Sequence, residues 1–192
     1  PDPIDPQTAQ DAYAEALKRI EEARKTDARE LSLYDLPLTE LSPEIGSCTA
    51  LETLKLAHEW DPSKSKCRLQ TLPAAIGQLS KLTRLDLREN SLSDLPAEIG
   101  QLSKLTRLDF SQNSLSVLPA EIGQLSQLTR LDLSQNSLSA LPAEIGQLSK
   151  LTRLDLRQNS PSALPPEIGP LPDVAVLSLS QIRVTNFPAN RA

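Results

Sequence analysis

Leucine and isoleucine recur along most of this chain at intervals that repeat every 23 residues. The segment LTRLDL begins at Leu82, and the same pattern begins again at Leu105, Leu128 and Leu151. Within each 23-residue unit, apolar residues lie at positions 1, 4, 6, 11, 14, 18 and 21. A polar position 5 separates positions 4 and 6, which predicts a short strand with one buried face. One unit cannot bury its own apolar face, so we expect stacked units to share a core.

Three further positions carry a fixed residue type in the four central units. Position 15 is proline, which sets the backbone φ angle for a short helical turn. All six glycines lie at position 19 once an insertion in the second unit is allowed for, so no glycine remains for a phosphate-binding loop or a dinucleotide fingerprint. Position 9 is asparagine, which we expect to turn the chain and bond backbone groups of adjacent coils. These asparagines are Asn90, Asn113, Asn136 and Asn159.

The repeat frame also divides the chain into two parts. It extends backward to units that begin at residues 51 and 28, and forward to one at 174, which makes seven units. We therefore predict an N-terminal tail and capping helix over 1–27 and a repeat domain over 28–192.

Residues 7–25 have the pattern of one amphipathic helix. Thr8 to Asp11 resembles a capping box, and Asp5-Pro6 offers an alternative start. The helix is expected to cover the exposed end of the first coil, and binding of a partner is the alternative role. Its apolar face comprises Tyr13, Ala16, Leu17, Ile20 and Ala23.

The unit L-x-x-L-x-L-x-x-N-x-L-x-x-L-P-x-x-I-G-x-L resembles the leucine-rich repeat family over about residues 28–188. The resemblance implies an α/β solenoid, which is a right-handed superhelix with the shape of a horseshoe. A parallel sheet would line its concave side, short helical turns its convex side, and a helix would cap its N-terminal end. Members of this family usually bind protein or peptide ligands through the outward strand positions 3, 5, 7 and 8.

The outward positions of this chain carry two columns of charge. Like charges on neighbouring strands repel, and diagonal Arg–Asp pairs would cancel that repulsion. One interpretation is a self-compensated, solvated ladder, in which each exposed pair contributes less than about 1 kcal/mol. The other is a polar strip that contacts a protein or peptide. Position 3 carries Arg84, Arg107, Arg130 and Arg153, position 5 carries Asp86, Asp109, Asp132 and Asp155, and position 7 carries Arg88 and Arg157.

The second unit is longer than the others because residues 57–66 replace the usual two between its strand and its ladder position. This insertion contains the only histidine, His58, and the only tryptophan, Trp60, near the outward residues Tyr34 and Lys55. Trp60 would either anchor a partner, since tryptophan is enriched at binding hot spots, or fold back onto the flank of the solenoid. We include these four residues in the predicted binding surface.

The two cysteines have structural explanations within the repeat. Cys67 takes the ladder position in place of asparagine, and Cys48 takes a core leucine position. A disulfide between them is the alternative, although the two positions lie on different edges of the coil. Two cysteines without suitably spaced histidines do not form a zinc site.

Composition and charge narrow the function classes. The chain contains 36 leucines among 192 residues and a net charge of −5. Nothing resembles the basic stripe with interleaved aromatics of a nucleic-acid-binding protein, and no apolar stretch is long enough to span a membrane. There is no paired-carboxylate or Ser/His/Asp arrangement, so a hidden hydrolase is disfavoured. We expect no enzymatic activity, no cofactor and no metal, and the oligomeric state stays open.

The beginning of the repeat region carries a second resemblance. The segments ALKRIEEARKTDARELSL and WDPSKSK are similar to the N-terminal repeat regions of bacterial Roco proteins, which carry a Ras-like GTPase and a dimerisation domain downstream. This implies the recognition domain of a larger, cytoplasmic signalling protein. The alternative is the host-target recognition domain of a secreted bacterial effector, such as a ubiquitin ligase.

Overall fold

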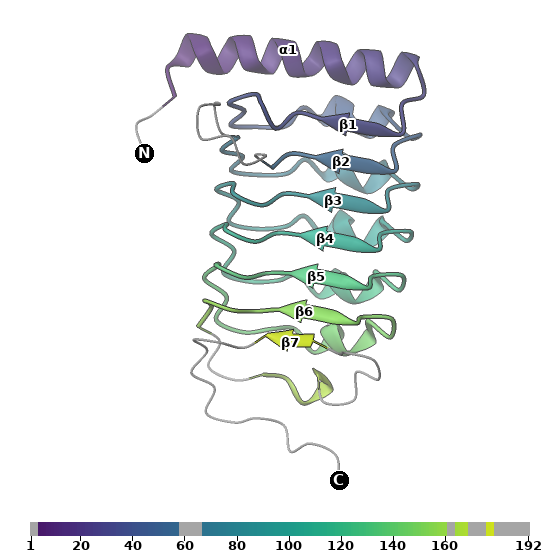
Figure 1. Cartoon of the computed structure of the whole chain (residues 1–192), viewed down its shortest axis with the longest axis vertical. Coiled ribbons are helices and arrows are strands. Elements are labelled where there is room, and N and C mark those ends of the chain that lie inside the picture. Colours follow the sequence, from purple (N-terminus) through teal and green to yellow (C-terminus); the bar gives the residue numbers. More distant parts are fainter. Residues whose placement is uncertain (1–3, 58–66, 161–163, 169–175, 179–192) are drawn as a thin grey trace.

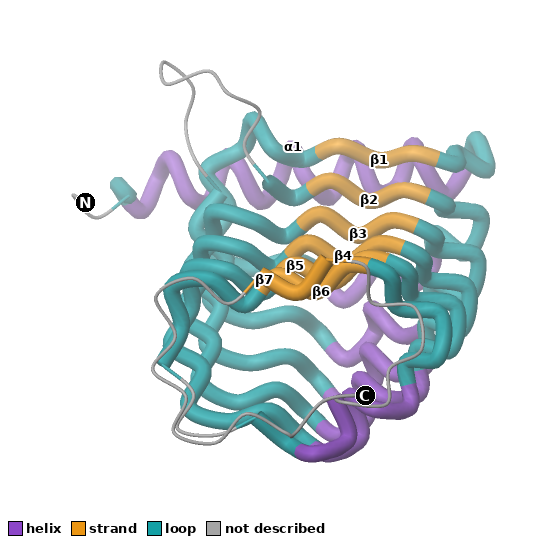
Figure 2. Tube along the Cα trace, turned by 60° about the horizontal axis from the view of Figure 1, so that its bottom comes forward, coloured by secondary structure: helices purple, strands orange, loops and turns teal. Residues whose placement is uncertain are grey.

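The computed structural model shows one helix followed by a stack of coils (Figure 1). It describes residues 4–57, 67–160, 164–168 and 176–178. Each of the six coils that begin at β1 to β6 contains one strand on one side and, on the other, one 3-10 helix, here labelled η. Figure 2 shows the strands and the 3-10 helices on opposite sides of the coils. The elements are α1 (Pro6–Lys25), β1 (Glu30–Ser32), η1 (Pro43–Ser47), β2 (Thr53–Lys55), η2 (Ala74–Gln78), β3 (Arg84–Asp86), η3 (Ala97–Gln101), β4 (Arg107–Asp109), η4 (Ala120–Gln124), β5 (Arg130–Asp132), η5 (Ala143–Gln147), β6 (Arg153–Asp155), η6 (Pro166–Ile168) and β7 (Val176–Ser178).

The strands form a parallel sheet of seven in chain order, with no shift in register from one strand to the next. Arg84 therefore lies beside Arg107, and Asp86 beside Asp109. The same pairing continues through β5 and β6. The two predicted columns of charge are thus real features of the concave sheet.

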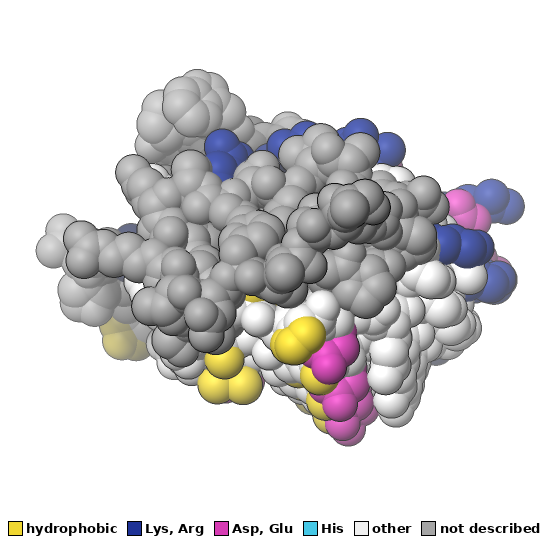
Figure 3. All heavy atoms as spheres, turned by 90° about the horizontal axis from the view of Figure 1, so that it is seen from below, with side chains coloured by type: hydrophobic (Ala, Val, Ile, Leu, Met, Phe, Trp, Pro, Cys, Tyr) yellow, Lys and Arg dark blue, Asp and Glu magenta, His cyan; other side chains and the backbone are white. Residues whose placement is uncertain are grey.

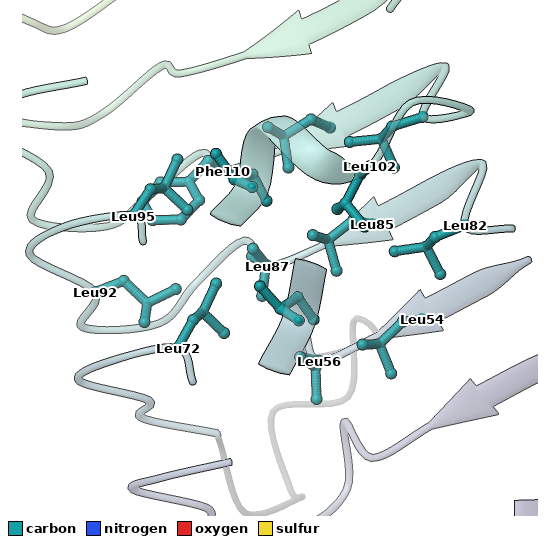
Figure 4. Packing of buried hydrophobic residues seen from close by; sticks show 14 of the residues in the cluster. Leu54, Leu56, Leu72, Leu82, Leu85, Leu87, Leu92, Leu95, Leu102 and Phe110 are labelled. Atoms are coloured by element: carbon teal, nitrogen blue, oxygen red, sulfur yellow. The ribbon is translucent and has the colours of Figure 1, made fainter. Parts of the chain in front are cut away.

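The apolar positions of the repeat fill the space between the strands and the 3-10 helices (Figure 4). In the unit that begins at Leu82 none of the seven apolar residues is more than 6% exposed, which confirms the predicted core positions. Because the same positions recur in each central unit, one continuous core runs through the stack. The seven residues are Leu82, Leu85, Leu87, Leu92, Leu95, Ile99 and Leu102.

The helical turns on the convex side are 3-10 helices that begin just after the proline at position 15. Pro96, with φ −66° and ψ 146°, precedes the first residue of η3. The Ile99 N–H donates to the Pro96 carbonyl at 3.0 Å, and the Leu102 N–H donates to the Ile99 carbonyl at 3.2 Å. This three-residue spacing of hydrogen bonds defines the 3-10 helix and returns the chain toward the sheet within a few residues.

The glycine at position 19 allows successive coils to approach closely. A Cβ atom on Gly100 would lie 2.7 Å from the Glu121 carbonyl oxygen and 2.7 Å from Gln124 Oε1. Both distances are shorter than a real Cβ contact, and one of the two neighbours is backbone. Position 19 is therefore glycine because of the space between coils rather than because of its backbone angles.

We predict that Gly100→Ala lowers the free energy of unfolding by about 1–3 kcal/mol, the usual cost of overpacking a close contact. Urea denaturation followed by circular dichroism measures the change. Ser103→Ala alters an exposed residue of the same coil and is the matched control. Equal stability of the two variants would show that the coils are not in close contact here.

The asparagine at position 9 joins each coil to the preceding one, as the sequence predicts. In all four cases Oδ1 accepts the N–H of position 11 of the preceding unit at 2.9–3.0 Å. Nδ2 donates to the carbonyl of position 6 of that unit at 2.8–3.0 Å. The ladder satisfies backbone groups that the short strands leave unpaired.

Cys67 occupies the same ladder position, and its thiol donates to the Leu36 carbonyl at 3.2 Å and to the Leu33 carbonyl at 3.6 Å. Cys48 is buried, and its thiol donates to the Ile20 carbonyl of α1. Both cysteines are free, so the disulfide alternative is wrong. Burial raises the pKa of the Cys67 thiol to about 12, which keeps it protonated and able to donate.

The N-terminal helix covers the first coil, as predicted, but it begins earlier and is turned slightly. Asp5 caps it by accepting the Thr8 N–H at 3.0 Å, so the capping box from Thr8 to Asp11 is wrong and the Asp5-Pro6 start is correct. Tyr13 and Leu17 are only half-buried. The buried face consists of Ala12, Ala16, Ile20 and Ala23.

Candidate functional site

The concave sheet contains a hollow of about 160 Å³ over β3–β6. We call it the Arg/Asp groove, and its charged lining residues are Arg84, Arg107, Arg130, Arg153, Asp109 and Asp132. Figure 3 views the molecule from its C-terminal end, and Lys and Arg side chains are visible along its upper edge, where the sheet lies, and along its right-hand edge. Acidic side chains gather at the lower edge, on the side where Figure 2 places the 3-10 helices.

The backbone fixes the four aspartates of position 5 in one local arrangement. In each, Oδ1 accepts the N–H of the residue two positions later, at 3.0–3.5 Å. This Asx-type hydrogen bond turns the carboxylate along its own strand and away from the neighbouring strand. The residue at position 7 then decides which other group the carboxylate meets.

At both ends of the groove, position 7 is arginine, and the aspartate is covered. Arg88 Nη2 lies 3.1 Å from Asp86 Oδ2, and Arg157 Nη2 lies 2.6 Å from Asp155 Oδ2. Asp86 is 3% exposed and Asp155 is 0% exposed. Both carboxylates of the predicted binding surface are therefore buried in this structure, each in contact with the arginine two residues later.

In the middle of the groove, position 7 is serine, and the carboxylates stay partly open. The hydroxyls of Ser111 and Ser134 donate to Oδ1 of Asp109 and Asp132 at 2.7 and 2.6 Å. Within the described part of the chain, Oδ2 of these two aspartates receives no hydrogen bond and no ion pair.

Three arginines of the groove are also without ionic partners. Over residues 4–57, 67–160 and 164–168, no carboxylate lies within 4 Å of the guanidinium groups of Arg107, Arg130 or Arg153. Arg84 makes one contact of 3.8 Å with Asp86 on its own strand. The predicted diagonal pairing between the columns is therefore wrong for these strands, since the aspartates turn along their own strands.

The remaining predicted site residues lie on or after the first two strands. Lys55 forms a diagonal ion pair of 2.6 Å with Glu30 on the adjacent strand β1, and Tyr34 is half-buried just after β1. Neither lines the Arg/Asp groove. His58 and Trp60 lie outside the described residues. Sequence reasoning missed the role of Ser111 and Ser134, although the change at position 7 from arginine in the outer two central units to serine in the inner two is visible in the sequence.

Burial raises the pKa of Asp132 above its ordinary value, and hydrogen bonds from Ser134 partly oppose the shift. The pKa of Asp86 is also raised by burial, with Arg88 as the main opposing influence. The folded protein holds these protons more tightly than the unfolded chain does. The stability that each aspartate contributes is therefore lost as pH rises from its pKa in the unfolded chain to its higher pKa in the folded protein.

We predict that Asp132→Asn stabilises the protein at pH 7, and that the gain disappears at a pH below the ordinary aspartate pKa. The amide oxygen still accepts from Ser134, whereas the cost of a desolvated charge is removed. Urea denaturation at pH 7 and at pH 3 measures the difference from the wild type, and Asp94→Asn on an exposed loop is the control. A gain that does not change with pH would contradict the assignment.

Other chemistry is not indicated in the parts of the chain that the structure covers. No three His, Cys, Asp or Glu side chains there are grouped so as to hold a metal ion. No helix among these residues has both the length and the apolar character needed to cross a membrane.

Comparison with known proteins agrees with this architecture. The sequence model described as "Leucine rich repeat" matches residues 80–138 and 103–160. The fold and the repeated columns define a solenoid of stacked repeats with an open sheet face. This match and the fold make the chain similar to the leucine-rich repeat family over residues 80–160, and members of that family are generally non-catalytic scaffolds and typically protein-interaction modules.

Several solved structures are similar to the chain. The ectodomain of the Arabidopsis thaliana receptor kinase GASSHO1/SCHENGEN3 is 29% identical with a TM-score of 0.70, over 84% of this chain and 20% of that one. The plant peptide hormone receptor RGFR1 is 31% identical with a TM-score of 0.64, over 85% and 30%. An internalin from Listeria monocytogenes, 19% identical with a TM-score of 0.61 over 82% and 48%, shares the fold.

The chain spans less than two thirds of the length of each of these structures. A search of curated proteins gave no match.

Proposed function

We propose that this chain is a non-catalytic module that binds an extended peptide or protein segment on its concave face. The observation that carries the proposal is the Arg/Asp groove, in which three guanidinium groups and two carboxylate oxygens lack partners among the described residues. Polar groups in a concave hollow are the usual means by which a site orients a ligand.

Two of the similar structures support the peptide interpretation. RGFR1 was solved in complex with RGF2, and the GASSHO1/SCHENGEN3 ectodomain in complex with CASPARIAN STRIP INTEGRITY FACTOR 2. Each of these two structures shares more than a quarter of its aligned residues with this chain, and each alignment covers more than four fifths of this chain.

A steric block on each face tests the proposal. Peptides selected on the wild-type chain from a random display library are offered to two variants. Arg107→Trp/Arg130→Trp fills the concave face, whereas Ala97→Trp/Ala120→Trp adds the same bulk to exposed positions of the convex 3-10 helices. We expect recovery to be lost in the first variant and kept in the second. Recovery that depends on the convex pair instead would refute concave-face binding.

We further propose that the module belongs to a larger bacterial signalling protein of the Roco type and acts in the cytoplasm. The resemblance of ALKRIEEARKTDARELSL and WDPSKSK to the start of such repeat regions supports this setting. The alternative is the target-recognition domain of a secreted effector. The full open reading frame tests both, because a downstream GTPase domain fits the first and a catalytic cysteine domain or a secretion signal fits the second.

A further inference from the structure

We propose that the Arg/Asp groove is specific for an extended peptide segment with a short cluster of acidic residues. Its carboxylates would pair with the row formed by Arg107, Arg130 and Arg153, and its donors would reach Oδ2 of Asp109 and Asp132. This inference rests on the proposed function, because it names the chemistry of the ligand that the concave face would bind.

The arginine row carries positive charge that the described residues do not balance. Arg107, Arg130 and Arg153 are exposed and stand in register on adjacent strands. Neighbouring parallel strands are about 4.8 Å apart, so the like charges of the row repel one another. No carboxylate of the described residues lies within 4 Å of these three guanidinium groups to offset that repulsion. An anionic ligand would supply the missing compensation.

The aspartate row decides between anionic ligands. Asp109 and Asp132 lie two residues after Arg107 and Arg130, which places their Cα atoms about 6.6 Å farther along the same strands. Their free Oδ2 atoms call for hydrogen-bond donors. A peptide provides acidic side chains at one edge and N–H groups at the other. A phosphodiester backbone provides only acceptors and would meet these carboxylates with like charge.

Position 7 sets the length of the segment. Asp86 and Asp155 are already paired with Arg88 and Arg157, so the free acceptors are confined to β4 and β5. The row from Arg107 to Arg153 spans two strand spacings, or about 10 Å. An extended chain covers that distance in about three residues. The ligand should therefore carry two or more acidic residues within a stretch of about four.

The test compares two variants that lose the same charge from the repeat domain. Arg107→Gln/Arg130→Gln/Arg153→Gln empties the row, whereas Lys81→Gln/Lys104→Gln/Lys150→Gln removes three exposed lysines that do not line the groove. Peptides are selected on the wild-type chain from a random display library, and fluorescence anisotropy measures their dissociation constants for all three proteins. Unchanged urea midpoints confirm that the variants fold.

The proposal expects acidic clusters to be enriched among the selected peptides. The arginine variant should bind them about tenfold more weakly or worse, as three exposed ionic contacts predict, while the lysine variant should stay within about twofold. Raising the salt concentration should weaken binding to the wild type and leave the arginine variant nearly unaffected.

Three results would overturn the inference, and they differ in what they imply for peptide binding on the concave face. Peptides that lack acidic clusters, bind the arginine variant as well as the wild type and are blocked by Arg107→Trp/Arg130→Trp would show that the face is used without its charge. A ten-nucleotide oligothymidylate that binds the wild type and not the arginine variant would assign the row to phosphate. Selected peptides that bind the arginine variant and the Trp variant as tightly as they bind the wild type would reject the inference and the proposed function together.

Discussion

Replacing Phe110 with alanine should lower the free energy of unfolding by about 3–5 kcal/mol, the usual cost of removing a fully buried aromatic side chain. Phe110 is 0% exposed and occupies position 6, where the other central units have leucine. In a solenoid each coil is stabilised by its two neighbours, so the cavity weakens the interfaces on both sides. Chemical denaturation with a tryptophan-independent signal, such as circular dichroism, measures the loss.

Phe110→Leu is the matched control because it restores the consensus residue of the repeat. Leucine keeps more of the buried apolar side chain than alanine does, so the cavity and its cost in stability should be smaller. If the alanine variant were no less stable than the leucine variant, the side chain of Phe110 would not fill the core between coils.

Replacing Asn113 with alanine should cost about 2–4 kcal/mol, since it leaves buried backbone groups of two coils without partners. Oδ1 of Asn113 accepts the Leu92 N–H at 3.0 Å, and Nδ2 donates to the carbonyls of Leu87, Phe110 and Ser111 at 2.9, 3.2 and 3.2 Å. The measurement is again the free energy of unfolding in urea.

Two further variants distinguish the loss of the Asn113 hydrogen bonds from other effects of a substitution at this turn. Ser114→Ala changes the next residue, which is exposed, and should have little effect. Asn113→Cys copies the residue that Cys67 supplies in the second unit, where the thiol donates to carbonyl groups. It should therefore recover part of the loss. A cysteine variant as unstable as the alanine variant would argue against the donor role of position 9.

Much of the fold follows from the sequence because the repeat is an average over several copies of one unit. The period of leucine at positions 4 and 6 fixes the strand, and Asn113 and its equivalents fix the turn after it. The limits of α1 were harder to predict, since Asp5 and Thr8 are both capping residues. In the structure Asp5 is the residue that accepts the Thr8 N–H, and Ala12 joins the buried face while Tyr13 and Leu17 stay half-buried.

The candidate site was predictable in its columns but not in its pairing. Register alone places Arg107 beside Arg130. Whether an aspartate at position 5 is open depends on a side-chain rotation that the Asx-type hydrogen bond sets, and then on whether arginine or serine follows two residues later. That coupling covers Asp155 and leaves Asp132 partly open. The sequence shows the columns of arginine and aspartate but not the side-chain torsion angles. It therefore suggested diagonal Arg–Asp pairs between neighbouring strands instead.

The central claim is that ligands bind the concave Arg/Asp groove, and amide chemical-shift mapping tests it most directly. A selected peptide is titrated into the ¹⁵N-labelled chain, and the shift of each assigned backbone amide is followed. The account predicts that the largest changes fall in β4, β5 and β6, with little change in η3, η4 and η5. Changes concentrated in those convex 3-10 helices, or in α1, would contradict it.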